Sequence, residues 1–527
     1  MDPYIVKNFL FSTQPAILAL LILLCICLAI ISRKQIAEVF GSVPVRVIAA
    51  LIIIAAVGGG ARAFIVPQRH YVVFDEYEHL NAARNIERIH NFGYCVEGGG
   101  RECDSFEVRP YPAGHHVLLA AWMRIMGGSE RSAFMYSAFA GGLSIFFMGL
   151  LVMLLSGSGA AAVWSSLLLC FLPLHLKYSA ATSLEISSFL VLLVSFSAAA
   201  GAARFQSRKL MWLTFALTLY LANVRPENWI FLFFILIFFL THAPKLLYTD
   251  AGISKDLFLL IPGLAFLLPV VAANYLGRIA SPEPGWDESI AQYLTHFQTN
   301  FLPNLKYWAG SGFPFMLAPL AVAGAVQYRK KGAAAAAFWP GLFAALFVGY
   351  SAYHIGNFQS VDSDRYTLHM ALPVIICSGY FLGNIRLTSG RISGIAIPVV
   401  LCIALTGSYL FSGYATLPAS NRLDNEIRSI FPALRAQDEA LPVMAYNPAP
   451  YAASLNRRVV NLSIIQDPAE YPEDAIYIAY DPWTGSPGRA VVEPLLKKHY
   501  DFEKTATVES ESGEIDIFHI YRKDIGK

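Results

Sequence analysis

Long apolar segments recur along almost the whole chain, and they constrain its fold more than any other feature. A window of about 19 residues finds about twelve of them, several with the length of about 20 residues that spans a bilayer core. Only 14% of the 527 residues are charged, against about 25% in soluble proteins. We therefore expect a polytopic α-helical membrane protein. The segments cover residues 15–32, 46–67, 132–156, 160–178, 184–203, 210–222, 229–240, 257–275, 312–326, 333–350, 366–382 and 392–411.

The charged residues are concentrated in two polar regions. Thirteen lie between Pro67 and Pro112, and 29 follow Gly413. The net charge is only +2, which excludes the basic footprint of a nucleic-acid-binding protein. These observations predict three domains: an extra N-terminal transmembrane helix with a cytoplasmic loop at 1–45, a transmembrane domain at 46–412 with an outer loop at 67–131, and a soluble domain at 413–527.

Basic residues in alternate short loops predict the orientation, because such loops stay in the cytoplasm. Arg33 and Lys34 lie in one of these loops, and Arg204 and Arg208 lie in another. The outer loop, the turn around Arg225 and the C-terminal domain then face the extracytoplasmic side of an inner or plasma membrane. This register requires the two short segments around Arg225 to be separate spans. The first apolar segment lacks a small-residue cleavage site, so we interpret it as a retained helix.

The C-terminal region has the pattern of a soluble α/β domain. Its apolar alternation predicts strands at 441–446, 458–462, 475–479 and 515–521, with helices at 423–434 and 491–498. A body of about 115 residues can bury its own core.

Two of the seven cysteines, Cys95 and Cys103, fall in the outer loop. An oxidising compartment would permit a disulfide between them. Free thiols or a metal pair are the alternatives, but no histidine stands at zinc-finger spacing, so we predict the disulfide.

The outer loop begins with an acidic motif that contains Asp75, Glu76 and Glu78 and opens a predicted interfacial amphipathic helix. In the ordinary interpretation Asp75 is the N-cap, while Glu76 and Glu78 complement the helix dipole. The alternative is a catalytic carboxylate at the membrane surface.

Other charged residues are predicted on the same side of the membrane. Each could be a surface ion pair or a snorkelling anchor, which is the usual fate of such residues. Several ionisable clusters on one rim together indicate a functional site, because charges near membrane depth are costly. A Pro-rich segment there precedes a predicted half-length apolar helix at 113–126. The clusters contain Glu107, Arg109 and Tyr111; Glu185; Arg225 and Glu227; and Asp362, Asp364, Arg365 and Tyr366.

Together these features resemble the GT-C superfamily of glycosyltransferases. The Asp75-Glu76 pair, the Pro-rich segment before a half-helix, the Arg365-Tyr366 pair before a late span and the outer α/β domain carry the resemblance. The branch of protein O-mannosyltransferases and lipid A aminoarabinose transferases is the most similar. The chain departs from the latter, which carry an adjacent Glu-Lys where Glu107-Val108-Arg109 stands here.

The resemblance implies an enzyme that moves a sugar from a polyprenyl-phosphate donor to an acceptor hydroxyl at the outer face. The acceptor would be a lipid, a glycan or a protein. Asp75 would be the general base, and Glu76, about 100° away on the helix, would orient the acceptor or bond to the backbone. The sequence predicts these further roles: Arg109, Arg365 and, third, Arg225 for the leaving phosphate; Glu107 or Glu185 to stabilise charge on the sugar; and Tyr366, His79 and Tyr111 for other substrate contacts.

No metal or other cofactor is expected. The first outer loop has no Asp-x-Asp motif, and Asp362-Ser363-Asp364 in a later loop is a short pattern of low specificity. Two alternative functions stay open, a secondary transporter or lipid flippase and a non-catalytic glycan-binding membrane protein. Transporters tend to place polar sites near the midplane between related halves, whereas these charges gather at one rim and no repeat is visible. A salt bridge such as Arg225 with Glu227 is the structural alternative for each charged residue.

Overall fold

The computed structural model forms two compact units. The helical unit comprises Met1–Gln68, Pro110–Leu118 and Phe134–Thr416, and the mixed unit comprises Arg69–Arg109, Leu119–Ala133 and Leu417–Lys527. The structure describes residues 3–99, 102–107, 111–249, 252–253, 260–280, 289–311, 313–314, 316–360, 363–384, 414–447, 449–455, 457–462, 471–480, 487–511 and 513–523.

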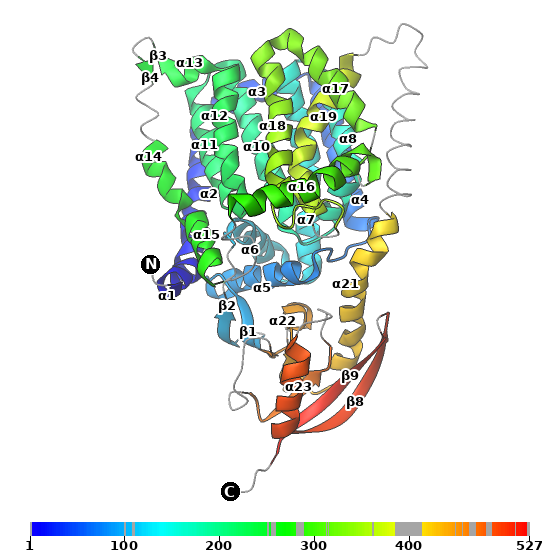
Figure 1. Ribbon diagram of the computed structural model, residues 1–527. Coiled ribbons are helices and arrows are strands. Elements are labelled where there is room, and N and C mark those ends of the chain that lie inside the picture. The colour runs from blue at the N-terminus through cyan, green and yellow to red at the C-terminus, as the bar shows by residue number, and fades with distance from the viewer. Residues whose placement is uncertain are drawn as a thin grey trace. The chain divides into compact units, whose positions relative to one another are not determined.

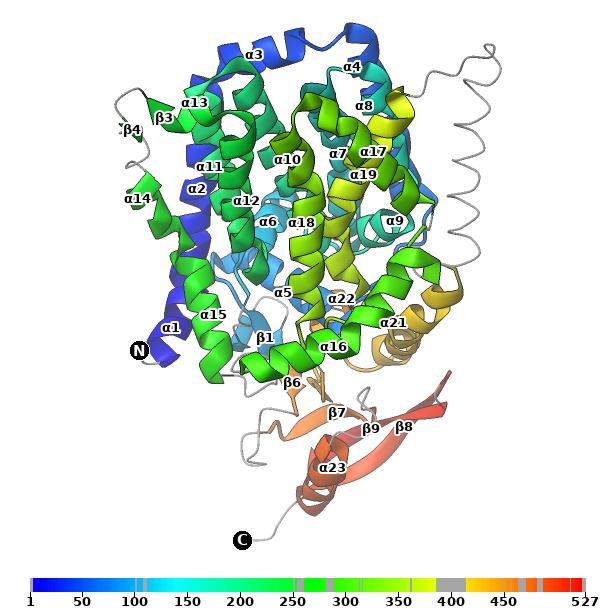
Figure 2. The same ribbon diagram turned by 45° about the horizontal axis from the view of Figure 1, so that its top comes forward.

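Apolar helices build the helical unit, and many of them run side by side (Figures 1 and 2). Of the described helices, six are long and apolar enough to cross a membrane, or seven if one bent pair is a single span. The protein is therefore a polytopic helical membrane protein, while the expected segment at 392–411 lies outside the described residues. The first span, Ile5–Ile31, includes α2 (Gln14–Ile31), and the last, Asp364–Asn384, joins η7 (Asp364–Tyr366) to α19 (Thr367–Asn384). The four spans between them are α4 (Val45–Phe64), α7 (Glu130–Ser156), α10 (Leu184–Phe205) and α18 (Ala333–Ser351).

The bent pair replaces the single segment that the sequence predicted at 160–178. Helix α8 (Gly159–Cys170) and helix α9 (Pro173–Ser179) meet at an angle of 62°. Pro173 lacks a backbone N–H and its ring clashes with the preceding turn, so the helix breaks there.

Shorter helices complete the helical unit. The two segments around Arg225 form separate helices with a 3-10 turn between them, and neither is among the six candidate spans. These shorter elements are α3 (Arg33–Gly41), α11 (Arg208–Ala222), η2 (Pro226–Trp229), α12 (Ile230–His242), α15 (Leu268–Ala280), α16 (Ile290–Lys306) and α17 (Leu317–Tyr328).

Glycines allow helix α19 to approach its two neighbours closely. A Cβ atom on Gly383 would lie 2.3 Å from the backbone nitrogen of Ala161 in α8, and one on Gly324 of α17 would lie 1.9 Å from the carbonyl oxygen of Cys377. Backbone atoms cannot move aside as a flexible side chain can. The contacts therefore depend on small residues, as is common between membrane helices.

A seven-stranded mixed sheet organises the mixed unit, in the order β2-β1-β6-β5-β7-β9-β8. The hairpin of the outer loop, β1–β2, pairs antiparallel with β6, where Glu97 lies opposite Val460. The outer loop and the C-terminal region thus share one sheet. The strands are β1 (Tyr94–Gly99), β2 (Glu102–Glu107), β5 (Val443–Ala445), β6 (Val459–Asn461), β7 (Asp474–Ile478), β8 (Tyr500–Ser510) and β9 (Gly513–Arg522).

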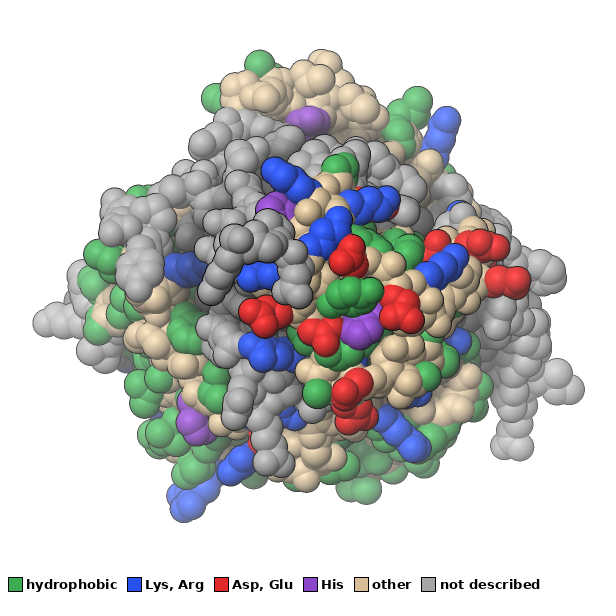
Figure 3. Space-filling view, turned by 90° about the horizontal axis from the view of Figure 1, so that it is seen from below, with side chains coloured by type: hydrophobic (Ala, Val, Ile, Leu, Met, Phe, Trp, Pro, Cys, Tyr) green, Lys and Arg blue, Asp and Glu red, His purple; other side chains and the backbone are tan. Residues whose placement is uncertain are grey.

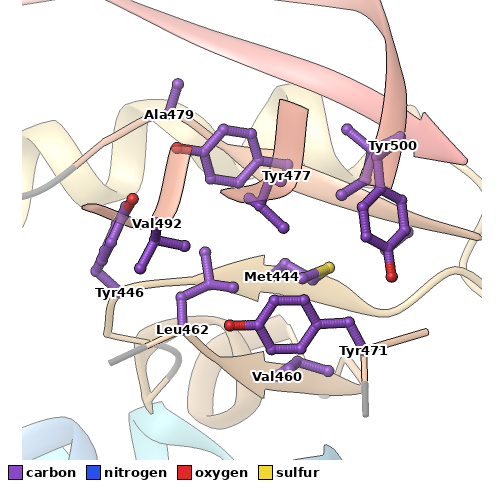
Figure 4. Close-up of a cluster of buried hydrophobic side chains, with 12 residues drawn as sticks. Met444, Tyr446, Val460, Leu462, Tyr471, Tyr477, Ala479, Val492 and Tyr500 are labelled. Carbon is purple, nitrogen blue, oxygen red and sulfur yellow. The ribbon is translucent and has the colours of Figure 1, made fainter. Parts of the chain in front are cut away.

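Helices α21 (Tyr414–Arg435), α22 (Ala449–Leu455) and α23 (Pro487–His499) accompany this sheet. Its core contains Met444, Tyr477, Leu496 and Ile520, all fully buried and part of the cluster in Figure 4. A face of the molecule seen in Figure 3 carries acidic and basic side chains side by side, with no single sign dominant. The buried cluster of Met444, Tyr477, Leu496 and Ile520 gives the C-terminal sheet region a core.

Helix α5 (Val73–Ile89) holds the acidic motif, and α6 (Gly114–Met126) is the expected half-length helix. The interpretation of Asp75 as the N-cap is wrong. Val72 occupies that position and makes no side-chain cap, while Asp75 lies inside the first turn. The side chain of Glu76 takes over the capping, because it accepts bonds from the backbone N–H groups of Tyr71 and Val72, each at 2.9 Å.

Candidate active site

Charged side chains from three parts of the sequence meet in the helical unit, and we call this group the Arg225 cluster. It consists of Arg225 and Glu227 before α12, Glu185 at the start of α10, and Arg365 and Tyr366 in η7. The Arg225 guanidinium lies 3.2 Å from Glu185 and 2.6 Å from Glu227. The structure thus brings together four residues that the sequence predicted for the site: Glu185, Arg225, Arg365 and Tyr366. It also contains the salt bridge between Arg225 and Glu227 that was the structural alternative to a functional role.

Arg225 makes two short contacts with carboxylates, to Glu185 and Glu227. Burial alone would lower the pKa of the Arg225 guanidinium, but the charges of Glu227 and Glu185 raise it. The Nε atom of Arg365 lies 3.9 Å from Glu185, which is too long for a hydrogen bond. Both guanidinium groups lie over the ring of Tyr366, at 5.1 Å and 5.6 Å from its centroid, and such cation–π contacts stabilise them.

A further ion pair involves Asp364, which precedes Arg365 in the sequence. Its carboxylate lies 2.8 Å from the ammonium group of Lys177 and also accepts a hydrogen bond from the hydroxyl of Tyr178, both on α9. The Asp364 side chain keeps 18% of its surface exposed, and that of Arg365 keeps 13%. Together, the Arg225 cluster and this pair contain three basic groups and three acidic groups, so their formal charges cancel.

The backbone around Arg225 is fixed by its contact with helix α6. The N–H of Gly114 donates to the carbonyl of Asn223 at 2.8 Å, and the Tyr220 hydroxyl donates to the carbonyl of Gly114 at 2.7 Å. A Cβ atom at Gly114 would lie 2.3 Å from the Asn223 oxygen, so this close approach needs glycine. The half-length helix therefore anchors the turn that carries Arg225.

Buried hydrogen bonds to neighbouring helices hold the first turns of α10. Ser187 bonds to His115 and to Tyr136, each at 2.9 Å, and Ser188 bonds to His369 at 2.8 Å. Buried polar groups are stable only when they are bonded in this way. The network holds the helix end from which Glu185 projects.

Helix α5 carries two of the acidic candidates, Asp75 and Glu76, and it belongs to the mixed unit. Asp75 is half-buried, whereas Glu76 is fully buried and His79 is 4% exposed. Besides the two backbone N–H groups, Glu76 contacts the Nδ1 atom of His70 at 2.9 Å. Of the two roles considered for Glu76, bonding to the backbone is the one seen here.

The other predicted residues fall partly outside the described structure. Arg109 lies outside the described residues. Glu107 ends strand β2 and accepts a bond from the Tyr94 hydroxyl at 2.9 Å, and Tyr111 is half-buried in the bend before α6. Cys95 is disulfide-bonded, whereas the side chain of Cys103, on the opposite strand of the hairpin, is not described, so their pairing stays a prediction.

The described residues contain no group of three His, Cys, Asp or Glu side chains that could hold a metal ion. Asp362, the first acid of the Asp-x-Asp pattern, lies outside them. The independence from metal and other cofactors therefore stays a prediction.

No protein-family model and no curated protein matches the sequence. Solved structures do match the fold. ArnT from Cupriavidus metallidurans bound to undecaprenyl phosphate has a TM-score of 0.55 and 13% identity, with 90% of this chain and 97% of that chain covered. The apo structure of the same protein gives 0.54 and 14%, with the same coverage. The chain therefore shares the fold of ArnT. The archaeal oligosaccharyltransferase AglB from Archaeoglobus fulgidus gives a TM-score of 0.44 at 13% identity, with 89% and 74% covered.

The sequence missed Lys177 as a member of the charged cluster. The residue lies within an apolar segment, and its partner Asp364 is 187 residues away. A single lysine inside an apolar run is itself a signal, because an ionisable group at membrane depth needs a partner. Tyr178, the neighbour that shares Asp364, had no comparable signal.

Proposed function

We propose that the protein is a membrane glycosyltransferase that moves a sugar from a polyprenyl-phosphate donor to an acceptor hydroxyl at the outer face of the membrane. The observation that carries the proposal is the GT-C fold, which matches over 90% of the chain, joined to a buried cluster of guanidinium groups. ArnT was solved with undecaprenyl phosphate, a ligand of the same class as the proposed donor.

Arg365 is the proposed principal ligand of the donor phosphate, together with Arg109. A guanidinium donates two parallel hydrogen bonds to phosphate and keeps its charge. The Arg365 side chain keeps 13% of its surface exposed, against 5% for that of Arg225, and this greater exposure supports the choice. Arg225 already shares two short contacts with carboxylates, so we assign it a secondary role.

Asp75 is the proposed general base. As the acceptor oxygen attacks the anomeric carbon, its proton passes to the Asp75 carboxylate. The bond between that carbon and the phosphate oxygen breaks, and the electron pair leaves with the polyprenyl phosphate. The negative charge that develops on the leaving group is stabilised by the arginines, and Glu185 stabilises positive charge on the sugar.

A transfer assay with purified protein and a series of synthetic polyprenyl-phosphate sugars tests this function. Asp75→Asn keeps the size of the side chain and should lower kcat at least about a hundredfold, the usual contribution of a general base. Full activity of this variant would remove Asp75 as the base.

Arg365→Ala should raise the KM for the donor, while Glu439→Gln, which changes an exposed acid of the mixed unit, serves as a control. An unchanged KM in Arg365→Ala would contradict the phosphate assignment. Transport of the lipid across the membrane without sugar transfer would instead indicate a transporter or flippase.

A further inference from the structure

A fully buried histidine in the mixed unit lies between two carboxylates. The Nδ1 atom of His70 is 2.9 Å from an oxygen of Glu76, and its Nε2 atom is 2.8 Å from an oxygen of Glu130. A neutral imidazole carries one N–H, whereas a protonated ring donates from both nitrogens. Since a carboxylate only accepts, the two contacts are both hydrogen bonds only when His70 is protonated.

Further groups surround this arrangement, and we call the whole set the His70 clasp. Glu130 also contacts Arg428 at 2.5 Å, and Arg428 lies 2.8 Å from Asp424. The Tyr77 hydroxyl donates to Asp424 at 2.9 Å, and the Tyr77 ring centroid is 4.1 Å from that of His70. The protonated clasp holds two positive and three negative groups, and loss of the His70 proton would leave one positive group among three negative ones.

The local charges favour the protonated ring. Burial alone would lower the pKa of His70, but its hydrogen bonds to Glu130 and Glu76, together with the charges of Glu76 and Asp424, raise the pKa to about 9. The imidazolium thus persists at neutral pH, well above the usual range for histidine.

The clasp also determines how helix α5 begins. Glu76 bonds to His70 on one side and to the N–H groups of Tyr71 and Val72 on the other. Asp75 is its direct neighbour in the same turn. Whatever fixes the Glu76 carboxylate therefore fixes the backbone from which Asp75 projects.

We propose that the His70 clasp is a positioning device for Asp75, and that it holds the first turn of α5 in place only while His70 is protonated. This inference rests on the proposed function for the role of Asp75. The positioning itself does not depend on that function, so the two can be tested separately.

Hydrogen exchange of the full-length wild-type protein in detergent tests the positioning without any variant. After correction for the intrinsic pH dependence, amide protection of the peptide that spans residues 70–76 should fall about tenfold per pH unit above about 9. A peptide within α10 should keep its protection. Unchanged protection of residues 70–76 between pH 7 and pH 10.5 would overturn the proposal.

The pH profile of sugar transfer tests the link to catalysis. Wild-type kcat should fall about tenfold per pH unit above a midpoint of about 9. Glu130→Gln removes one negative partner of His70, so the midpoint should move down by about one unit or more, with little change in the KM for the donor. Glu439→Gln changes an exposed acid of the same unit and should leave the midpoint in place.

Ser454→Ala is a milder variant that removes only a 3.3 Å bond to Glu130, and it serves if Glu130→Gln does not fold. Without this donor the charge of the Glu130 carboxylate is less compensated, so the midpoint should move up, by a smaller amount than Glu130→Gln moves it down. An alkaline limb that neither variant moves would overturn the link to catalysis. Absence of transfer from every lipid-linked sugar would refute the proposed function, while the exchange experiment would still decide on the clasp.

Discussion

Glu185→Gln is the most informative perturbation of the Arg225 cluster. The Glu185 side chain is 2% exposed, and one oxygen faces both Arg225 at 3.2 Å and Arg365 at 3.9 Å. Removing one partner of a buried ion pair costs about 3–5 kcal/mol, because the remaining charge is left uncompensated. Glu227 still compensates Arg225 at 2.6 Å, so we expect the lower end, about 3 kcal/mol.

Thermal unfolding in detergent, followed by tryptophan fluorescence, measures this loss. The control is Glu493→Gln, which removes the half-buried i,i+4 partner of the exposed Lys497 and should cost no more than about 0.5 kcal/mol. Saturating undecaprenyl phosphate should stabilise Glu185→Gln more than the wild type, since the phosphate supplies the missing negative charge. Unfolding of Glu185→Gln at the wild-type temperature, or equal stabilisation of both proteins by the lipid, would refute the reasoning.

Three further predictions concern the fold. Gly383→Ala should cost about 1–3 kcal/mol through overpacking against α8, whereas Gly341→Ala, which has open space around it, should gain up to about 1 kcal/mol; equal unfolding temperatures would contradict the packing. Peptide mapping without reductant should recover Cys95 joined to Cys103, and two alkylated thiols would exclude this pair. Because the folded pKa of His70 is about 9 and the unfolded value about 6.5, its stabilisation is complete below pH 6.5 and is lost as pH rises through 9. The loss should reach about 3 kcal/mol, and a flat stability profile over this range would contradict it.

The sequence predicted most of the described apolar helices, because long apolar runs depend only on local composition. However, only six or seven of about twelve expected segments are long and apolar enough to cross a membrane among the described residues. The break at Pro173 could also have been predicted, since proline cannot continue a helix. Pairings between distant residues were harder. Nothing in the sequence near Glu97 indicates that it lies opposite Val460, because the pairing of two strands depends on long-range packing rather than on local pattern.

The candidate site was predictable in its residue types and less so in its contacts. Arg225, Glu185 and Arg365 were recognised because charges are rare and costly in such a chain. The capping of α5 was not, since Asp75 had the usual residue type for an N-cap while Glu76 performs that task. A side chain that bonds backwards to the preceding backbone cannot be recognised from residue type alone.

Native mass spectrometry of the purified protein, released from detergent with its bound lipids, tests the central claim most directly. The account predicts a bound polyprenyl phosphate, free or sugar-linked, that is retained by Glu493→Gln and lost or strongly depleted in Arg365→Ala. Wild-type protein that carries only bulk phospholipids, even after incubation with a polyprenyl-phosphate sugar, would contradict the account.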